Sequence, residues 1–186
     1  MKMKLAFGAL IAGIGILMSQ YVAAAEEAAK ADDAWLKDAT KWKFSNGQEV
    51  NGGAKGGFSV ADVDGKKTGK IDFDFSAGGG YVTASCEFVG GDAFSNIKVL
   101  VKSETKAQLL VRIKDAAQET YQYKLKYTTP GQWQELTIDP KSPAAKFGGD
   151  ANGTFDFPAK KFAIGVSKGK DADKGILYFT AIQTVK

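Results

Sequence analysis

Histidine is absent from this chain of 186 residues, and cysteine occurs once, as Cys86. Without histidine the sequence lacks the commonest general base and the commonest transition-metal ligand. Catalysis by a Ser-His-Asp or Cys-His arrangement is therefore excluded, and a typical zinc site is not expected. A single cysteine also excludes an intramolecular disulfide, so the fold must be stabilised by packing.

Arginine also occurs only once, as Arg112, and the other basic residues among the 25 are all lysines. Lysine is the usual solvated surface charge and does not form the planar fork that binds phosphate in two places. Removing Lys2 and Lys4, which lie in the export signal described below, leaves 23 basic against 21 acidic residues, a net charge of +2. This balance gives no case for a nucleic-acid partner.

The N-terminus has the pattern of a secretory signal peptide. A basic start at residues 1–4 is followed by an uncharged apolar run at 5–18 and by three alanines at 23–25, which suit a signal peptidase. The run is shorter than the ~20 apolar residues that span a membrane. The sequence thus predicts a cleaved signal peptide over 1–25, a periplasmic or extracellular location, and no membrane span in the mature protein.

Residues 26–41 are rich in Ala, Asp and Lys and show no strand pattern, so we expect a short helix or a mobile leader there. From residue 42 to residue 186, glycine clusters separate short segments in which apolar and polar residues alternate. Side chains change face at every step along a strand, so this alternation predicts half-buried strands. The segments with this pattern are 71–75, 82–88, 97–101, 109–113, 121–127, 136–138 and 162–166.

These segments predict an all-β domain over 42–186, an antiparallel β-sandwich of about nine or ten strands. Two of them, 109–115 and 120–127, flank a short turn and predict a β-hairpin. The last segment, 176–182, is apolar on both faces and is expected to lie at the centre of a sheet or under cover.

Arg112 is the first candidate for ligand binding. Alternation puts it on the polar face of its strand, beside Lys114 and across from Gln122 and Lys124. A guanidinium makes paired hydrogen bonds to a carboxylate or to adjacent sugar hydroxyls, which an ammonium does not. The alternative is a cross-strand ion pair with an Asp or Glu.

Aromatic residues outside the predicted core form the second set of candidates. Tyr81, Trp133 and Trp42 are potential stacking platforms, since the apolar C–H face of a sugar packs on an aromatic ring. The alternative for each ring is packing at the rim of the sandwich. Tyr121 and Tyr123 alternate with polar residues and are assigned to the core.

Carboxylates offer weaker signals. Asp72 and Asp74 share a strand face, and a glycosidase needs two carboxylates that flank a bond. The alternative is an ordinary solvated strand face. The acidic segments 62–65 and 171–173 could supply oxygen ligands for calcium or be acidic turns, but the twelfth position from Asp62 is Phe73 where an EF-hand needs Glu.

Several stretches resemble a known family: WKFSNGQE at 42–49, IDFDFS at 71–76, LVRIKD at 110–115, YQY at 121–123, GQW at 131–133, FAIGV at 162–166 and GILYF at 175–179. Together they resemble the jelly-roll carbohydrate-binding domains of the galactose-binding-like superfamily, which is related to the complex I intermediate-associated protein family. The resemblance implies a jelly roll with a glycan cleft on a concave sheet, and it implies Arg112, Gln122 and Trp133 as cleft residues. It also implies a structural calcium ion with Glu49 as a ligand, although Thr180 stands where such domains usually carry Asp.

We therefore expect a secreted, non-catalytic protein that binds a polysaccharide or oligosaccharide through Arg112, Gln122, Trp133, Tyr81 and Lys124. No cofactor is expected apart from the calcium ion. One alternative is a structural module that docks a protein partner of the cell envelope. Another is a jelly-roll glycoside hydrolase or lyase that uses Asp72, Asp74, Glu49 or Glu87.

Overall fold

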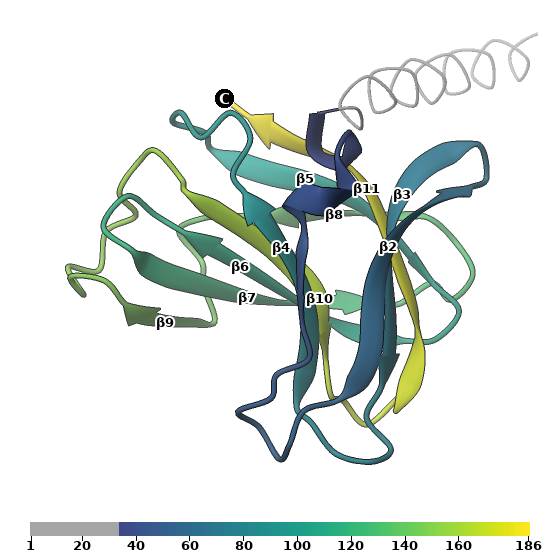
Figure 1. Ribbon diagram of the computed structural model, residues 1–186. Helices are drawn as coiled ribbons and strands as arrows, with labels where there is room; N and C mark the ends of the chain where they lie inside the picture. The colour runs from purple at the N-terminus through teal and green to yellow at the C-terminus, as the bar shows by residue number, and fades with distance from the viewer. Residues whose placement is uncertain (1–33) are drawn as a thin grey trace, which may run out of the picture.

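Two antiparallel β-sheets pack face to face in the computed structural model, which describes residues 34–186 (Figure 1). The six-stranded sheet has the order β1 (Lys43–Ser45), β4 (Tyr81–Glu87), β10 (Lys161–Ser167), β6 (Ala107–Lys114), β7 (Glu119–Tyr127) and β9 (Ala145–Gly148). The five-stranded sheet has the order β2 (Lys55–Val63), β3 (Lys66–Asp74), β11 (Lys174–Val185), β5 (Asn96–Ser103) and β8 (Gln134–Ile138). The predicted all-β sandwich is confirmed, with eleven strands in the described part of the chain.

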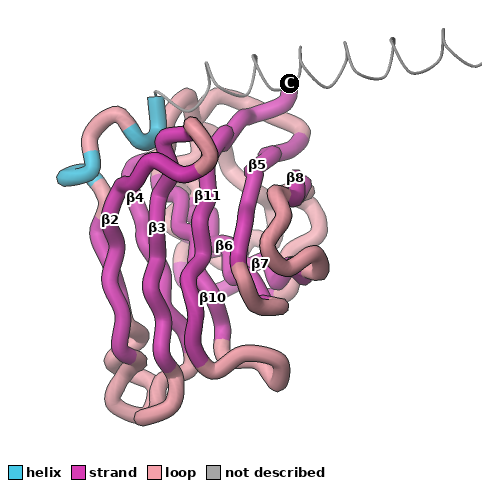
Figure 2. The backbone as a smooth tube through the Cα atoms, turned by 90° about the vertical axis from the view of Figure 1, so that its right-hand side faces the viewer, coloured by secondary structure: helices cyan, strands magenta, loops and turns pink. Residues whose placement is uncertain are grey.

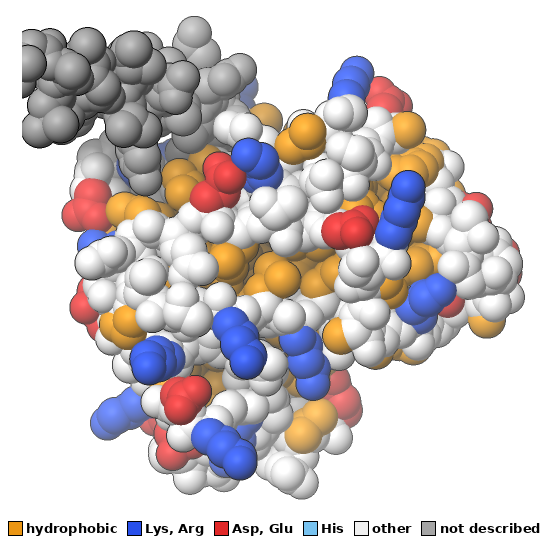
Figure 3. Space-filling view, turned by 180° about the vertical axis from the view of Figure 1, so that it is seen from behind, with side chains coloured by type: hydrophobic (Ala, Val, Ile, Leu, Met, Phe, Trp, Pro, Cys, Tyr) orange, Lys and Arg blue, Asp and Glu red, His pale blue; other side chains and the backbone are white. Residues whose placement is uncertain are grey.

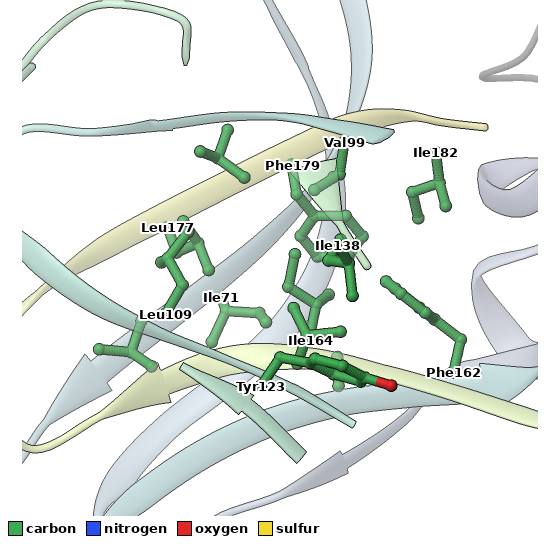
Figure 4. Packing of buried hydrophobic residues seen from close by; sticks show 14 of the residues in the cluster. Ile71, Val99, Leu109, Tyr123, Ile138, Phe162, Ile164, Leu177, Phe179 and Ile182 are labelled. Carbon is green, nitrogen blue, oxygen red and sulfur yellow. The ribbon is translucent and has the colours of Figure 1, made fainter. Parts of the chain in front are cut away.

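The core lies between the sheets and consists of the residues that alternation turns inward (Figure 4). Burying such side chains stabilises a fold by about 25 cal/mol per Å² of apolar surface removed from water. Every strand segment predicted from 71 to 166 places the apolar residues of its inward face in this core or packed against it. Fully buried examples are Ile71, Phe75, Val82, Ala84, Ile97, Val99, Val101, Leu109, Val111, Ile113, Phe162 and Ile164.

Strand β11 is central, as its two apolar faces predicted, with β3 and β5 as neighbours (Figure 2). Its Phe179 pairs with Gly69 of β3, and a Cβ atom at Gly69 would lie 2.2 Å from the Phe179 ring. Glycine at position 69 thus leaves the space that the ring fills.

The turns follow the local sequence. Strands β6 and β7 form the predicted hairpin, in which Arg112 lies opposite Gln122. Strands β2 and β3 form a second hairpin that turns at Asp64 and Gly65, with φ angles of 53° and 72°. Asp-Gly suits a two-residue turn that needs positive φ at both positions. The acidic segment 62–65 therefore forms a hairpin turn, in line with the alternative to a calcium site.

The core also includes residues ahead of strand β1. Trp35 and Leu36 are buried, and a 3₁₀ turn η1 (Ala39–Lys41) separates them from Trp42. The indole N–H of Trp42 donates to the carbonyl of Trp35 at 2.8 Å, and its ring stacks on Phe58. Trp42 is only 6 % exposed, so its suggested role as a stacking platform is wrong: the ring belongs to the core.

The predicted signal peptide, 1–25, and the first half of the predicted leader, 26–33, lie outside the described residues. Within residues 34–186, no helix has the length and hydropathy needed to cross a membrane. Seen from behind, the surface carries basic and acidic side chains close to one another at several places (Figure 3).

Candidate functional site

A hollow of about 230 Å³ opens on the outer face of the six-stranded sheet. We call it the sheet hollow. Its floor includes Ala163, a small residue on strand β10 in the interior of the sheet. Longer side chains from the surrounding strands form the walls. The lining residues are Ser45, Thr83, Ser85, Arg112, Lys114, Thr120, Phe147, Lys161 and Ala163.

Arg112 is held in place on one wall of the sheet hollow. Its Nε–H donates to Oε1 of Gln122 at 2.9 Å, across the β6–β7 pair. Its guanidinium carbon lies 4.4 Å from the centre of the Tyr81 ring and 5.7 Å from the centre of the Phe147 ring. Cation–π contacts of this kind fix the plane of the guanidinium. Within residues 34–186 no carboxylate forms an ion pair with Arg112, so the expected alternative of a cross-strand ion pair is not formed.

Tyr81 is positioned from its other end by Glu49. The Tyr81 hydroxyl donates to the Glu49 carboxylate, and this hydrogen bond holds the pKa of Glu49 below its usual value. Calcium prefers a cage of several oxygen ligands. In the described part of the chain no three His, Cys, Asp or Glu side chains gather into a metal site. The residues present thus form no carboxylate cage around Glu49, and its role as a calcium ligand stays a prediction.

Of the remaining predicted binding residues, one lies on this face and one does not. Lys124 is exposed on β7, two residues beyond Gln122, where it pairs with Leu110. Trp133 lies in the loop before β8, and its indole N–H donates to Oδ2 of Asp64 at 2.9 Å. The structure therefore brings Arg112, Gln122 and Tyr81 into contact, leaves Lys124 exposed on the same sheet face, and places Trp133 against the five-stranded sheet.

Phe147 is a residue of the sheet hollow that the sequence did not reveal. It lies on β9, which pairs with β7, and 48 % of it is exposed. A strand of four residues has too little alternation to be recognised. Its only sequence signal is a large apolar side chain next to Gly148 and Gly149, in an otherwise polar stretch.

Asp74 and Cys86 have pKa shifts opposite to those of a glycosidase acid and of a reactive thiol. Asp72 pairs with Lys70 at 3.1 Å. Hydrogen bonding by Ser76, first from its side chain and then from its backbone N–H at 2.8 Å, lowers the pKa of Asp74. A glycosidase acid needs a raised pKa instead. Burial raises the pKa of Cys86 to about 12, so this thiol is not an activated nucleophile.

Searches of protein-family models and of curated proteins gave no match. Solved structures do share the fold. A family 11 carbohydrate-binding module from a cellulosomal cellulase of Clostridium thermocellum aligns with a TM-score of 0.56 at 14% identity, over 78% of this chain and 87% of that one. The module TmCBM61, in complex with β-1,4-galactotriose, aligns with a TM-score of 0.50 at 9% identity, over 81% and 92%.

An exo-β-agarase aligns with a TM-score of 0.54 at 11% identity and covers 83% of this chain, but this chain spans only 25% of that protein. At these identities the comparisons establish the jelly-roll fold. The relation to the complex I intermediate-associated family stays a prediction.

Proposed function

We propose that this protein is a secreted, non-catalytic carbohydrate-binding protein that holds a polysaccharide or oligosaccharide in the sheet hollow. The observation that carries the proposal is the meeting of Arg112, Gln122, Tyr81 and Phe147 on one recessed sheet face. These residues come from four different strands and are brought together only by the fold.

The chemistry of this face suits a sugar. An exposed ring such as Phe147 offers an apolar surface to the C–H face of a pyranose, as aromatic rings in binding sites do. Arg112 adds hydrogen-bond donors whose direction is already fixed by Gln122 and Tyr81, so little side-chain entropy is lost on binding. Hydroxyl groups of Ser45, Thr83, Ser85 and Thr120 line the same hollow.

The names of the aligned structures support this proposal. Two of the aligned structures are carbohydrate-binding modules, and one of these is in complex with a galactotriose. Fold alone does not establish function, so the proposal rests on the side chains of the hollow. The predicted signal peptide supports a periplasmic or extracellular location.

The test is affinity electrophoresis of the processed protein through gels that contain soluble polysaccharides, with Arg112→Ala and Trp133→Ala in parallel. We expect one glycan class to retard the wild-type protein. Arg112→Ala should weaken this binding at least tenfold, whereas Trp133→Ala should leave it unchanged because Trp133 bonds to Asp64, away from the hollow.

No retardation in any gel, or normal binding by Arg112→Ala, would overturn the proposal. Loss of binding in Trp133→Ala alone would move the site to the five-stranded sheet. Release of reducing ends from any retarding polysaccharide would contradict the non-catalytic part of the proposal.

A further inference from the structure

Positive charge gathers in the lining of the sheet hollow. Arg112, Lys114 and Lys161 line it, and no carboxylate does. Lys114 and Lys161 are direct partners across the β6–β10 pair. Like charges in directly opposite positions destabilise a sheet. Glu87 is the partner of Lys161 on its other side, yet no ion pair within 4.0 Å joins any of these groups in the described part of the chain.

A second hollow, of about 290 Å³, repeats this pattern at the far end of the same strands. Lys106, Lys126 and Lys170 line it together with one carboxylate, Asp171. The row Ser167, Gln108 and Lys126 crosses β10, β6 and β7 four residues from the row Ala163, Arg112 and Gln122. At about 3.3 Å per residue, the two rows lie on the order of 13 Å apart.

The excess of positive charge in the hollows results from where the charged residues lie and not from the overall composition. The whole chain carries 25 basic and 21 acidic residues. All three ion pairs in residues 34–186 involve lysines of the five-stranded sheet: Lys70 with Asp72, Lys98 with Glu135 and Lys102 with Asp64. Three lysines of the five-stranded sheet thus have carboxylate partners, while none of the cations that line the two hollows forms an ion pair within the described residues.

We infer that the glycan bound on this face is an acidic polysaccharide, whose carboxylate or sulfate groups lie between Lys114 and Lys161 beside Arg112. This inference rests on the proposed function and narrows its ligand class. Charge-assisted hydrogen bonds from lysine and arginine to such anions are about twice as strong as neutral ones. A bound anion also removes the repulsion between Lys114 and Lys161. The lysines of the second hollow would bind a further anionic group of the same polysaccharide chain.

The experiment compares polysaccharides that differ only in charge, by affinity electrophoresis and calorimetry at low and moderate salt. The uronate pair is polygalacturonate and its fully methyl-esterified form, and the sulfate pair is a sulfated galactan and its desulfated form. We expect at least tenfold tighter binding to the charged member of one pair, weakening as salt screens the contacts. The pair that responds identifies carboxylate or sulfate as the anion.

Two double variants of equal net charge complete the design. Lys114→Gln with Lys161→Gln should weaken binding to the charged polymer at least tenfold. Lys55→Gln with Lys174→Gln removes two exposed lysines that flank Asp74 on the five-stranded sheet, and it should leave binding unchanged. Polyglutamate serves as a polyanion without sugar and should bind more weakly than the charged glycan.

Equal binding of neutral and charged members would overturn the inference and leave the proposed function intact. Equal losses in both double variants, or equal binding of polyglutamate, would also overturn it, because attraction would then depend on net charge alone. If no polysaccharide binds, the proposed function itself fails.

Discussion

The two outer faces of this sandwich are built over one core by the same kind of strand, yet they treat their charges differently. On the five-stranded sheet, three lysines form ion pairs with carboxylates, and Asp64 accepts hydrogen bonds from both Lys102 and Trp133 at 2.9 Å. On the six-stranded sheet, Arg112 is held by the neutral amide of Gln122 and by two rings. The first face satisfies its own polar groups, and the second leaves positive charge and hydrogen-bond donors available to a ligand.

Alternation along each strand decides which residues face solvent, while the residues on neighbouring strands decide whether a face can bind a ligand. Exposed ion pairs contribute only about 0–1 kcal/mol to stability each, so the five-stranded sheet gains little from its pairs. The ion pairs instead make these lysines less available to a ligand, because the ion pair must break before the lysine can bind another anion.

The largest expected effect comes from adding one methyl group to each sheet. A Cβ atom at Gly165, in the six-stranded sheet, would lie 1.9 Å from the carbonyl oxygen of Val82, whereas at Gly57 on β2 it would meet nothing within 4 Å. We expect Gly165→Ala to lower the free energy of unfolding by about 2–3 kcal/mol through overpacking. Gly57→Ala should be neutral or stabilising by up to about 1 kcal/mol.

Urea unfolding of both variants measures these values. Similar stabilities for the two would show that the backbone of β4 moves aside for the added Cβ atom, and the expected overpacking at Gly165 would then be wrong.

A smaller effect is expected when only the shape of one cation changes. Arg112→Lys keeps the charge but loses the planar fork and the stacking on Tyr81. We expect affinity for the glycan to fall about tenfold, since a hydrogen bond to a charged group is worth about 1.5–3 kcal/mol and only part of it is lost. Lys102→Gln on the other face should change affinity less than twofold. Equal effects in calorimetric titrations would contradict the assignment of the site to the six-stranded sheet.

Much of the fold was predictable because its signal is local. The alternation at 109–113 and 121–127 depends only on which side chains leave water, and the structure pairs these segments as the predicted β6–β7 hairpin. Arg112 and Gln122 came together for the same reason, since their register follows from the turn between them.

The remaining features of the site depend on contacts between residues that are far apart in the sequence, and no local pattern predicts such contacts. Tyr81 reaches Arg112 across β10, and Phe147 arrives on a four-residue strand, so neither contact has a local signal. Trp133 was expected in the glycan cleft, but it lies in the loop before β8, and its indole N–H donates to Asp64. The role of Trp42 was misjudged because the sequence does not show which residue an aromatic ring just before a strand will pack against. Here it stacks on Phe58 in the core.

Removing one hydroxyl group tests how Tyr81 is positioned. In Tyr81→Phe the ring remains beside Arg112 but its hydrogen bond to Glu49 is lost, so the pKa of Glu49 should rise toward its usual value. We expect glycan affinity to fall only about two- to fivefold, consistent with a net value of about 0.5–1 kcal/mol for one hydrogen bond. Carboxyl NMR titration and calorimetry measure the two effects. An unchanged Glu49 pKa would show that the hydroxyl does not hold that carboxylate.

The smallest effect is a titration on the opposite face. The hydrogen bond from Lys102, followed by that from Trp133, lowers the pKa of Asp64. A carboxyl whose pKa is lower in the folded state than in the unfolded state stabilises the fold at pH values above its unfolded-state pKa. This stabilisation is lost as the pH falls through the folded-state pKa. The indole N–H resonance of Trp133 should therefore shift with a midpoint below the usual aspartate range.

In Lys102→Gln this midpoint should move back up, because the largest cause of the depression is gone. The hydrogen bond between Arg112 and Gln122 has no titrating partner and should persist over the same pH range. A Trp133 signal that does not respond to pH, or that titrates at the usual aspartate value, would show that Asp64 is not engaged. The contrast between a face that satisfies its own charges and a face that leaves them available would then lose one of its three ion pairs.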